Sequence, residues 1–116
     1  GIDARGFLFG TAIAIKTAKP LVLARKPGKL PGNIIKNSYS LEYGTNTLCL
    51  QQKSIEKFTS YAIIDDLLAT GGTASSVEKM LLEQNKEVTG LSVVVELEAL
   101  AGRKLLNCEV FSQITF

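Results

Sequence analysis

Residues 62–73, AIIDDLLATGGT, join an apolar run, two aspartates and a glycine turn. The continuous apolar residues of 61–65 are typical of a central strand in a parallel sheet, which is buried on both faces. The segment 74–85 follows, and its apolar positions recur at helical spacing. These positions are Val77, Met80, Leu81 and Leu82. The stretch predicts a strand–turn–helix unit with Asp65 and Asp66 at the carboxyl end of the strand.

The rest of the chain repeats this alternation of strands and helices. The expected elements are a buried helix at 7–17, strands at 20–24, 47–51, about 91–96 and 109–115, and a short helix at 101–107. Glycine and proline mark a loop at 25–33, and a polar segment without helical period covers 36–46. The fold class is therefore α/β, with a mostly parallel central sheet flanked by helices. We expect Phe7, Phe9 and Met80 in the core.

Composition limits the possible functions. The 116 residues suffice for one domain, residues 1–116, and no apolar run approaches the length of a membrane span. The net charge of +2 is too small to suggest a nucleic-acid partner. Histidine is absent, which excludes Ser-His-Asp and Cys-His catalysis and histidine metal sites. Cys49 and Cys108 lack metal-ligand spacing and predict free thiols in a reducing cytoplasm.

The turn at 69–73 has the chemistry of a phosphate site. Its glycines allow the backbone to approach a ligand, and the following helix N-terminus favours an anion. Thr70 and Thr73 add hydroxyl donors, while the two aspartates can accept hydrogen bonds from vicinal hydroxyls. The combination suits a ribose 5-phosphate. It matches neither GxxxxGK[ST] nor GxGxxG, which disfavours P-loop and dinucleotide sites.

Basic residues gather in one part of the chain. No acidic residue lies between Asp3 and Glu42. The cations of that region are Arg5, Lys16, Lys19, Arg25, Lys26, Lys29 and Lys36. Such a region can attract an anion, although a solvated basic face is the alternative reading.

Four motifs in order identify a resemblance. IIDDLLATGGT (63–73) closely resembles the phosphoribosyl-pyrophosphate signature of type I phosphoribosyltransferases, and its LLATGGT ending is similar to the adenine phosphoribosyltransferases. DARGFLFG (3–10) is similar to the pyrophosphate loop of that family, and RKPGKLPG (25–32) to its basic loop. YSLEYG (39–44) resembles its flexible loop over the active site. Residues 74–116 agree in general pattern.

The resemblance implies a purine salvage reaction. Adenine and phosphoribosyl pyrophosphate would give AMP and pyrophosphate, with Mg²⁺ bound mainly through the substrate and no dedicated protein metal site. It also implies a homodimer, no nucleic-acid or membrane partner and a cytoplasmic location. The alternatives are a transferase for another purine base, or a non-catalytic regulator that senses phosphoribosyl pyrophosphate.

Site residues follow from the matched motifs. Ribose and 5′-phosphate contacts fall on Asp65, Asp66, Ala69, Thr70, Gly71, Gly72 and Thr73. Pyrophosphate contacts fall on Asp3, Ala4, Arg5, Arg25, Lys26 and Lys29. The peptide bond between Asp3 and Ala4 matches one that is often cis in such enzymes.

The polar segment 36–46 carries the residues assigned to chemistry. Glu42 matches the acid–base residue at the purine imidazole nitrogen, a role within reach of a carboxylate where histidine is absent. Tyr43 would close over the base as part of a lid. We expect this segment to be mobile and to order on substrate binding. A solvated Glu42 and a packing Tyr43 are the alternative readings.

Family members carry an N-terminal portion before the DARGFLFG turn, including a hood that helps select adenine. The chain is thus expected to be a fragment that lacks the hood, which leaves the activity of the isolated fragment open. The presence of Glu42, Arg5 and Arg25 favours an enzyme over a regulator, which needs only the phosphate site.

Overall fold

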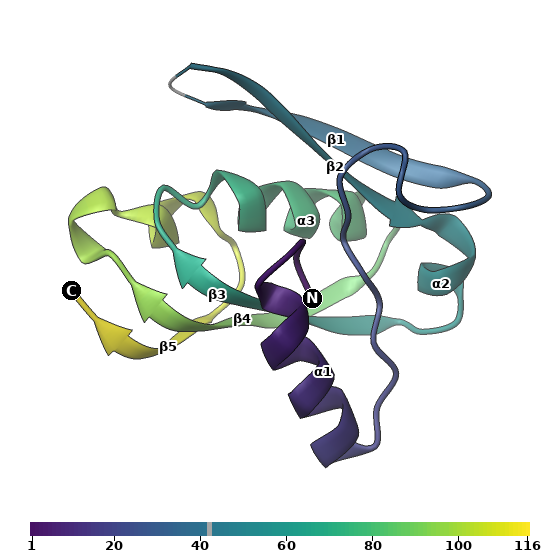
Figure 1. Ribbon diagram of the computed structural model, residues 1–116, viewed down its shortest axis with the longest axis horizontal. Helices are drawn as coiled ribbons and strands as arrows, with labels where there is room; N and C mark the ends of the chain where they lie inside the picture. The colour runs from purple at the N-terminus through teal and green to yellow at the C-terminus, as the bar shows by residue number, and fades with distance from the viewer. Residues whose placement is uncertain (42) are drawn as a thin grey trace.

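The computed structural model describes residues 1–41 and 43–116, and its centre is a parallel sheet. Three strands lie in the order β3 (Ser60–Leu68), β4 (Glu87–Glu96) and β5 (Val110–Thr115), as Figure 1 shows. Both neighbouring pairs are parallel. The predicted α/β class and parallel sheet are confirmed.

The edge of β3 is extended by two short segments. Ile2 donates its N–H to the carbonyl of Ile64 in β3, and on its other side it bridges Ala24. The strand predicted at 20–24 is therefore reduced to isolated bridges, Ile2 with Ala24 and Arg25 with Cys49. A regular strand needs consecutive ladder pairs, and the pairing here covers too few residues to form one.

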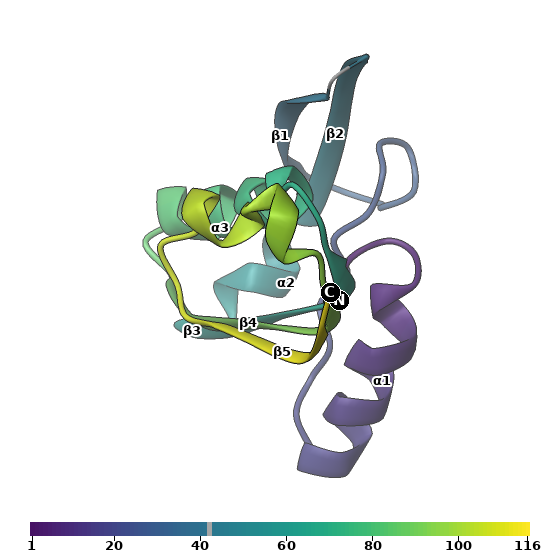
Figure 2. The same ribbon diagram turned by 90° about the vertical axis from the view of Figure 1, so that its left-hand side faces the viewer.

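Helix α3 (Gly72–Glu83) covers one face of the sheet, as Figure 2 shows. Val77, Met80 and Leu81 are buried as predicted, whereas Leu82 is 43% exposed. One hydrophobic core lies between this helix, the sheet and the strand β2 (Gly44–Gln51). This core consists of Ile2, Ala24, Leu48, Leu50, Ile55, Ile63, Leu68, Ala74, Val77, Met80, Leu81, Leu91, Val93 and Val110.

Helix α1 (Gly6–Thr17) forms where predicted but is not buried. It packs beside β3 and extends away from α3 (Figures 1 and 2). Its buried residues are two glycines, while Leu8 and Ile15 are more than 70% exposed. Phe9 is 39% exposed and Phe7 is half-buried, so the core assignment of Phe9 is wrong. Only the stripe with Gly6 and Gly10 meets the sheet, and the described residues leave the other faces uncovered.

A β-hairpin replaces the loop expected at 36–46. Strand β1 (Ile34–Leu41) pairs antiparallel with β2 (Gly44–Gln51), and α2 (Gln52–Glu56) follows. The sequence did not predict β1 and the outer half of β2 because their side chains are mostly polar and exposed or half-buried, whereas the buried residues Leu48, Cys49 and Leu50 form the apolar run of β2. The predicted strand at 47–51 is the inner half of β2.

The C-terminal region contains two short turns of 3₁₀ helix in place of one α-helix. These are η1 (Glu98–Leu100) and η2 (Gly102–Leu105), separated by Ala101 in the left-handed conformation with φ 51°. Ala101 ends the first turn, and Leu106, with extended backbone at φ −105° and ψ 142°, ends the second, so the region predicted as a helix at 101–107 holds one four-residue 3₁₀ turn. No helix among the described residues is long and apolar enough to cross a membrane.

Candidate active site

A cavity of about 380 Å³ opens at the carboxyl end of β3. It is lined by Asp3, Ala4, Arg5, Asp65, Asp66, Leu67, Leu68, Ala69, Thr70, Gly71, Thr73 and Ala74. Two of the four motifs, DARGFLFG and IIDDLLATGGT, therefore meet here. Their meeting at the carboxyl edge agrees with the general location of ligands in open α/β sheets.

The two aspartates lie within β3 and not after it, because the strand continues to Leu68. The side chain of Asp65 accepts a hydrogen bond from the backbone N–H of Asp66 at 2.9 Å. Gly6 allows the close approach of α1, since a Cβ there would lie 2.8 Å from Asp65 Oδ1. Burial, together with the neighbouring Asp66 carboxylate, raises the pKa of Asp65 to about 7.

The turn Ala69–Gly71, here called the phosphate turn, joins these acids to α3. Gly71 has φ +88°, a conformation that favours glycine, and precedes the first helical residue. Gly72 and Thr73 therefore belong to the first turn of the helix and not to the preceding loop. No side chain caps this N-terminus. Its backbone N–H groups and partial positive charge are available to an anion in the cavity.

Arg5 spans the mouth of the cavity. Its Nε forms an ion pair with Asp66 Oδ2, although the guanidinium side chain is 73% exposed. The preceding Asp3–Ala4 peptide bond is cis, as the resemblance implied. Arg5 and one of the two aspartate carboxylates that line the cavity are therefore paired with each other.

Asp3 connects the cavity to the basic loop, residues 25–33. Its carboxylate is 5% exposed and lies 3.4 Å from Arg25 Nε and 3.4 Å from the backbone N of Lys26. The Arg25 guanidinium also lies 5.6 Å from the centre of the Phe7 ring. Asp3, which lines the cavity, therefore contacts the start of the basic loop. This contact holds Arg25 at the edge of the site, although Arg25 itself does not line the cavity.

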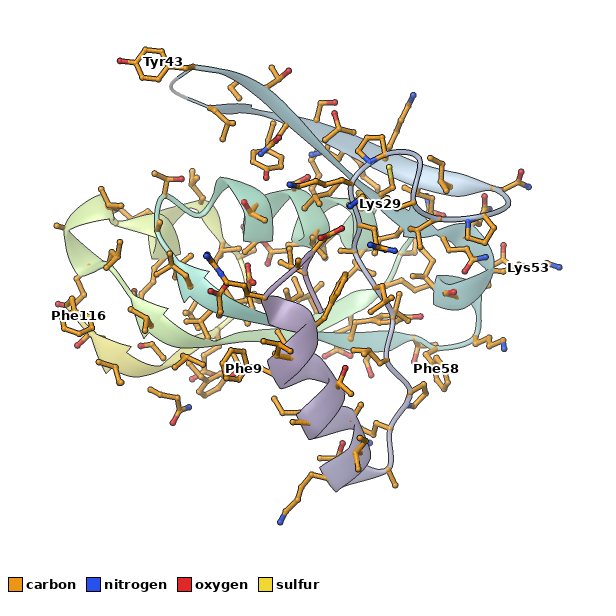
Figure 3. The ribbon with its side chains drawn as sticks, in the orientation of Figure 1. Phe9, Lys29, Tyr43, Lys53, Phe58 and Phe116 are labelled. Atoms are coloured by element: carbon orange, nitrogen blue, oxygen red, sulfur yellow. The ribbon has the colours of Figure 1, made fainter. Side chains whose placement is uncertain are left out.

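Other predicted site residues lie apart from the cavity. Lys26 and Lys29 are exposed on the basic loop, and Tyr43 is 89% exposed at the tip of the hairpin, as Figure 3 shows for Lys29 and Tyr43. Gly72 does not line the cavity. Glu42 lies outside the described residues. The pyrophosphate and lid roles of these residues stay predictions.

The structure adds Tyr39 to the site. Its hydroxyl lies 2.9 Å from Thr73 Oγ1, and its ring lies 3.1 Å from the position that a Cβ on Gly72 would occupy. Asn37 adds a second link to α3, because its side-chain amide donates to Ser76 Oγ at 2.9 Å. Tyr39 stands inside the YSLEYG motif, but its role depends on a contact with a residue 34 positions away.

Comparisons with known proteins identify the family of the chain. Paired carboxylates beside an uncapped helix N-terminus, at the carboxyl edge of a parallel sheet, define the class of type I phosphoribosyltransferases. No family model matches the chain. An adenine phosphoribosyltransferase of Prochlorococcus marinus (strain MIT 9211) is 61% identical over 115 residues, which span 99% of this chain and 67% of that protein.

The fold is also similar to solved structures of adenine phosphoribosyltransferases. The Saccharomyces cerevisiae adenine phosphoribosyltransferase, complexed with adenine and an imino-altritol bisphosphate, has a TM-score of 0.90 at 34% identity, over 97% of this chain and 64% of that chain. The Trypanosoma brucei enzyme, in complex with AMP, pyrophosphate and ribose-5-phosphate, has a TM-score of 0.90 at 29% identity, over 99% and 54%. The chain belongs to the adenine phosphoribosyltransferase family, whose reaction forms AMP in purine salvage.

Proposed function

We propose that this chain supplies the ribose 5-phosphate and pyrophosphate subsites for the conversion of adenine and phosphoribosyl pyrophosphate into AMP and pyrophosphate. The observation that carries the proposal is the single cavity shared by Asp65, Asp66 and the uncapped start of α3. Hydroxyl acceptors and an anion site stand side by side there. A sugar phosphate presents the complementary groups in the same order.

The 5′-phosphate would bind at the phosphate turn and the first turn of α3. Backbone N–H groups near Gly71 and the Thr73 hydroxyl act as donors, and the helix N-terminus stabilises the negative charge. The ribose hydroxyls then donate to the carboxylates of Asp65 and Asp66. Because Asp66 is paired with Arg5 in the described structure, substrate binding exchanges this partner. Arg5 becomes available to the pyrophosphate.

Bond cleavage at ribose C1 requires stabilisation of the departing pyrophosphate. Arg5 and Arg25 are the cations nearest to the cavity, and Asp3 holds Arg25 there. Lys26 and Lys29 add positive charge from the basic loop, and the backbone at Ala4 faces the cavity. Glu42 would exchange a proton with the purine imidazole nitrogen, and Tyr43 would cover the base.

Magnesium fits this donor set as a substrate-borne ion. Among the residues that the structure describes, no group of three or more acidic, histidine or cysteine side chains could hold a metal. Mg²⁺ commonly binds through one or two carboxylates together with substrate phosphates. The phosphate oxygens of phosphoribosyl pyrophosphate would hold most of its coordination, while Asp65 and Asp66 accept the ribose hydroxyls beside it. When bound, the ion would neutralise charge on the pyrophosphate oxygens.

A cytoplasmic location and a homodimer complete the proposal. Cys49 and Cys108 are free thiols, which suit a reducing compartment. The exposed apolar residues of α1, among them Leu8 and Ile15, offer surface that a second copy could cover.

The test supplies phosphoribosyl pyrophosphate, Mg²⁺ and one base at a time to the purified full-length protein, and measures nucleotide and pyrophosphate. The proposal predicts AMP from adenine and no nucleotide from hypoxanthine, guanine or xanthine. A nucleotide from another base would change the substrate class. Binding of phosphoribosyl pyrophosphate without product from any base would favour the sensing regulator.

A further inference from the structure

Gly102, outside the cavity, lies directly against the phosphate turn. A Cβ placed on Gly102 would lie 2.4 Å from the carbonyl oxygen of Ala69 and 3.0 Å from the nitrogen of Gly71. A Cβ placed on Gly71 would lie 2.5 Å from the carbonyl oxygen of Gly102. Both glycines are buried. The two backbones are therefore in contact at a spacing that no other residue type permits.

This contact acts at the middle of a turn whose ends are already held. Before the turn, the N–H of Leu97 donates to the carbonyl of Leu68 at 2.9 Å, which joins the ends of β4 and β3. After it, the N–H of Ser75 donates to the carbonyl of Gly71 at 2.9 Å. Gly102 contacts the residues between these two points. A shift of Gly102 would move the backbone that carries the N–H groups of the phosphate site.

Gly102 is in turn held by its neighbour Arg103. The Arg103 guanidinium donates to Glu96 Oε1 at 2.6 Å and Oε2 at 2.7 Å, in a bidentate pair. It also donates to the carbonyl of Val110 at 2.8 Å and to Ser112 Oγ at 3.2 Å. Glu96 is 3% exposed, and the Arg103 guanidinium lowers its pKa. Two strands of the sheet thereby anchor the η2 turn.

We propose that Gly102 and Arg103 are positioning residues for the 5′-phosphate site, acting through the backbone of the phosphate turn. The inference rests on the proposed function. Neither residue lines the cavity, so neither would touch the substrate. Gly102 sets the position of the Ala69–Gly71 backbone, and the Arg103–Glu96 pair fixes Gly102 to the sheet.

The role is specific to one end of the substrate. The pyrophosphate subsite depends on Arg5 and Arg25, which are held by Asp66 and Asp3. Within residues 1–41 and 43–116, the η2 turn makes no hydrogen bond to these four residues. Loss of the Gly102 contact should therefore reduce binding of a ribose 5-phosphate and leave binding of free pyrophosphate nearly unchanged. A purely structural role would weaken both.

The experiment measures ribose 5-phosphate and inorganic pyrophosphate affinities by calorimetry on Gly102→Ala, Arg103→Lys and wild type. Gly102→Ala should lower ribose 5-phosphate affinity about 10- to 100-fold, because a Cβ 2.4 Å from the Ala69 carbonyl oxygen must displace the turn that carries the phosphate donors, and change pyrophosphate affinity by less than about twofold. Arg103→Lys keeps the charge but loses the bidentate fork. It should lower ribose 5-phosphate affinity by a smaller factor and again leave pyrophosphate affinity nearly unchanged. The Arg103→Lys variant tests the proposal if Gly102→Ala fails to fold.

Lys104→Ala is the matched control, since Lys104 is exposed in the same turn. Its affinities should equal those of wild type. Equal losses for both ligands in Gly102→Ala and Arg103→Lys, or no loss for either ligand, would overturn the inference. Failure of the wild-type protein to bind ribose 5-phosphate would instead overturn the proposed function on which it rests.

Discussion

The phosphate turn and the tip of the β1–β2 hairpin differ in how they are built. The turn is held by β3, α3 and η2, with Gly71 and Gly102 in backbone contact. The hairpin extends across α3, and Tyr43 at its tip is 89% exposed (Figures 1 and 3). A tightly supported region suits the binding of a fixed group, whereas a projecting one suits covering a substrate that must enter and leave.

The hairpin and α3 are nevertheless joined by two side-chain hydrogen bonds. Tyr39 of the hairpin meets Thr73 at the start of α3, and Asn37 meets Ser76 one turn further along. We therefore expect changes in the phosphate region to alter affinity and changes at the hairpin tip to alter turnover. Substitutions at the contacts between the hairpin and α3 should have only small effects on affinity and on turnover.

The largest expected effect comes from Glu42 of the YSLEYG motif. Glu42→Gln should lower kcat by about 10²- to 10⁴-fold, the usual contribution of a general acid or base, with little change in the KM for phosphoribosyl pyrophosphate. Steady-state kinetics with adenine as the second substrate measures both constants. The opposite pattern, a raised KM with normal kcat, would move Glu42 from chemistry to binding.

Asp66→Asn should give the next largest effect, on the side of binding. Removing a charged acceptor for a ribose hydroxyl costs roughly 1.5 to 3 kcal/mol, about a 10- to 150-fold loss of affinity for phosphoribosyl pyrophosphate. Calorimetry checks it. Glu87→Gln, an exposed acid at the amino end of β4, is the control and should retain wild-type affinity. Unchanged affinity in Asp66→Asn would remove Asp66 from the ribose subsite.

The buried Asp65 carboxylate should make the unfolding free energy depend on pH. Its folded pKa of about 7 lies above the unfolded value of 3.8, so protonation stabilises the folded state. That stabilisation is complete below about pH 4 and is lost as pH rises through 7. The difference in unfolding free energy between Asp65→Asn and wild type should therefore shift in favour of the variant by roughly 1 to 3 kcal/mol from pH 5 to pH 8. Urea titrations at both pH values measure it, and a pH-independent difference would contradict this account.

Tyr39→Phe should give the smallest effect, since it removes one hydroxyl contact to Thr73 and keeps the ring. The expected loss is about 0.5 to 1.5 kcal/mol, or roughly 2- to 13-fold in affinity for phosphoribosyl pyrophosphate. Tyr61→Phe is the matched control, because the Tyr61 hydroxyl donates to the Ile55 carbonyl away from the cavity at 2.7 Å. It should lower stability without lowering affinity. Equal affinity losses in both variants would show that Tyr39 has no special link to the site.

The same contrast explains what could be predicted from the sequence. The phosphate region is local in sequence: an apolar strand, two acids, a glycine turn and an amphipathic helix follow one another within 61–83. Each has its own pattern, so the unit and the grouping of Asp65 with Thr73 were predicted. The end of β3 was placed too early because the acids continue the ladder with β4.

Features that depend on distant partners were not predicted. The β1–β2 pairing uses polar residues that carry no apolar alternation, and the exposure of α1 depends on which of its faces other elements cover. Tyr39 and Gly102 gain their places through contacts with Thr73 and Ala69, far along the chain. Their spacing within 39–44 and 101–107 holds no signal of those contacts.

The most direct test of the ribose 5-phosphate subsite is a titration of the ¹⁵N-labelled protein with ribose 5-phosphate, followed by backbone amide NMR. The account predicts that the largest shifts fall on the amides of Gly71, Gly72 and Thr73, with smaller changes at Asp65 and Asp66. Saturable shifts confined to the basic loop, or no saturable shift at the start of α3, would contradict it.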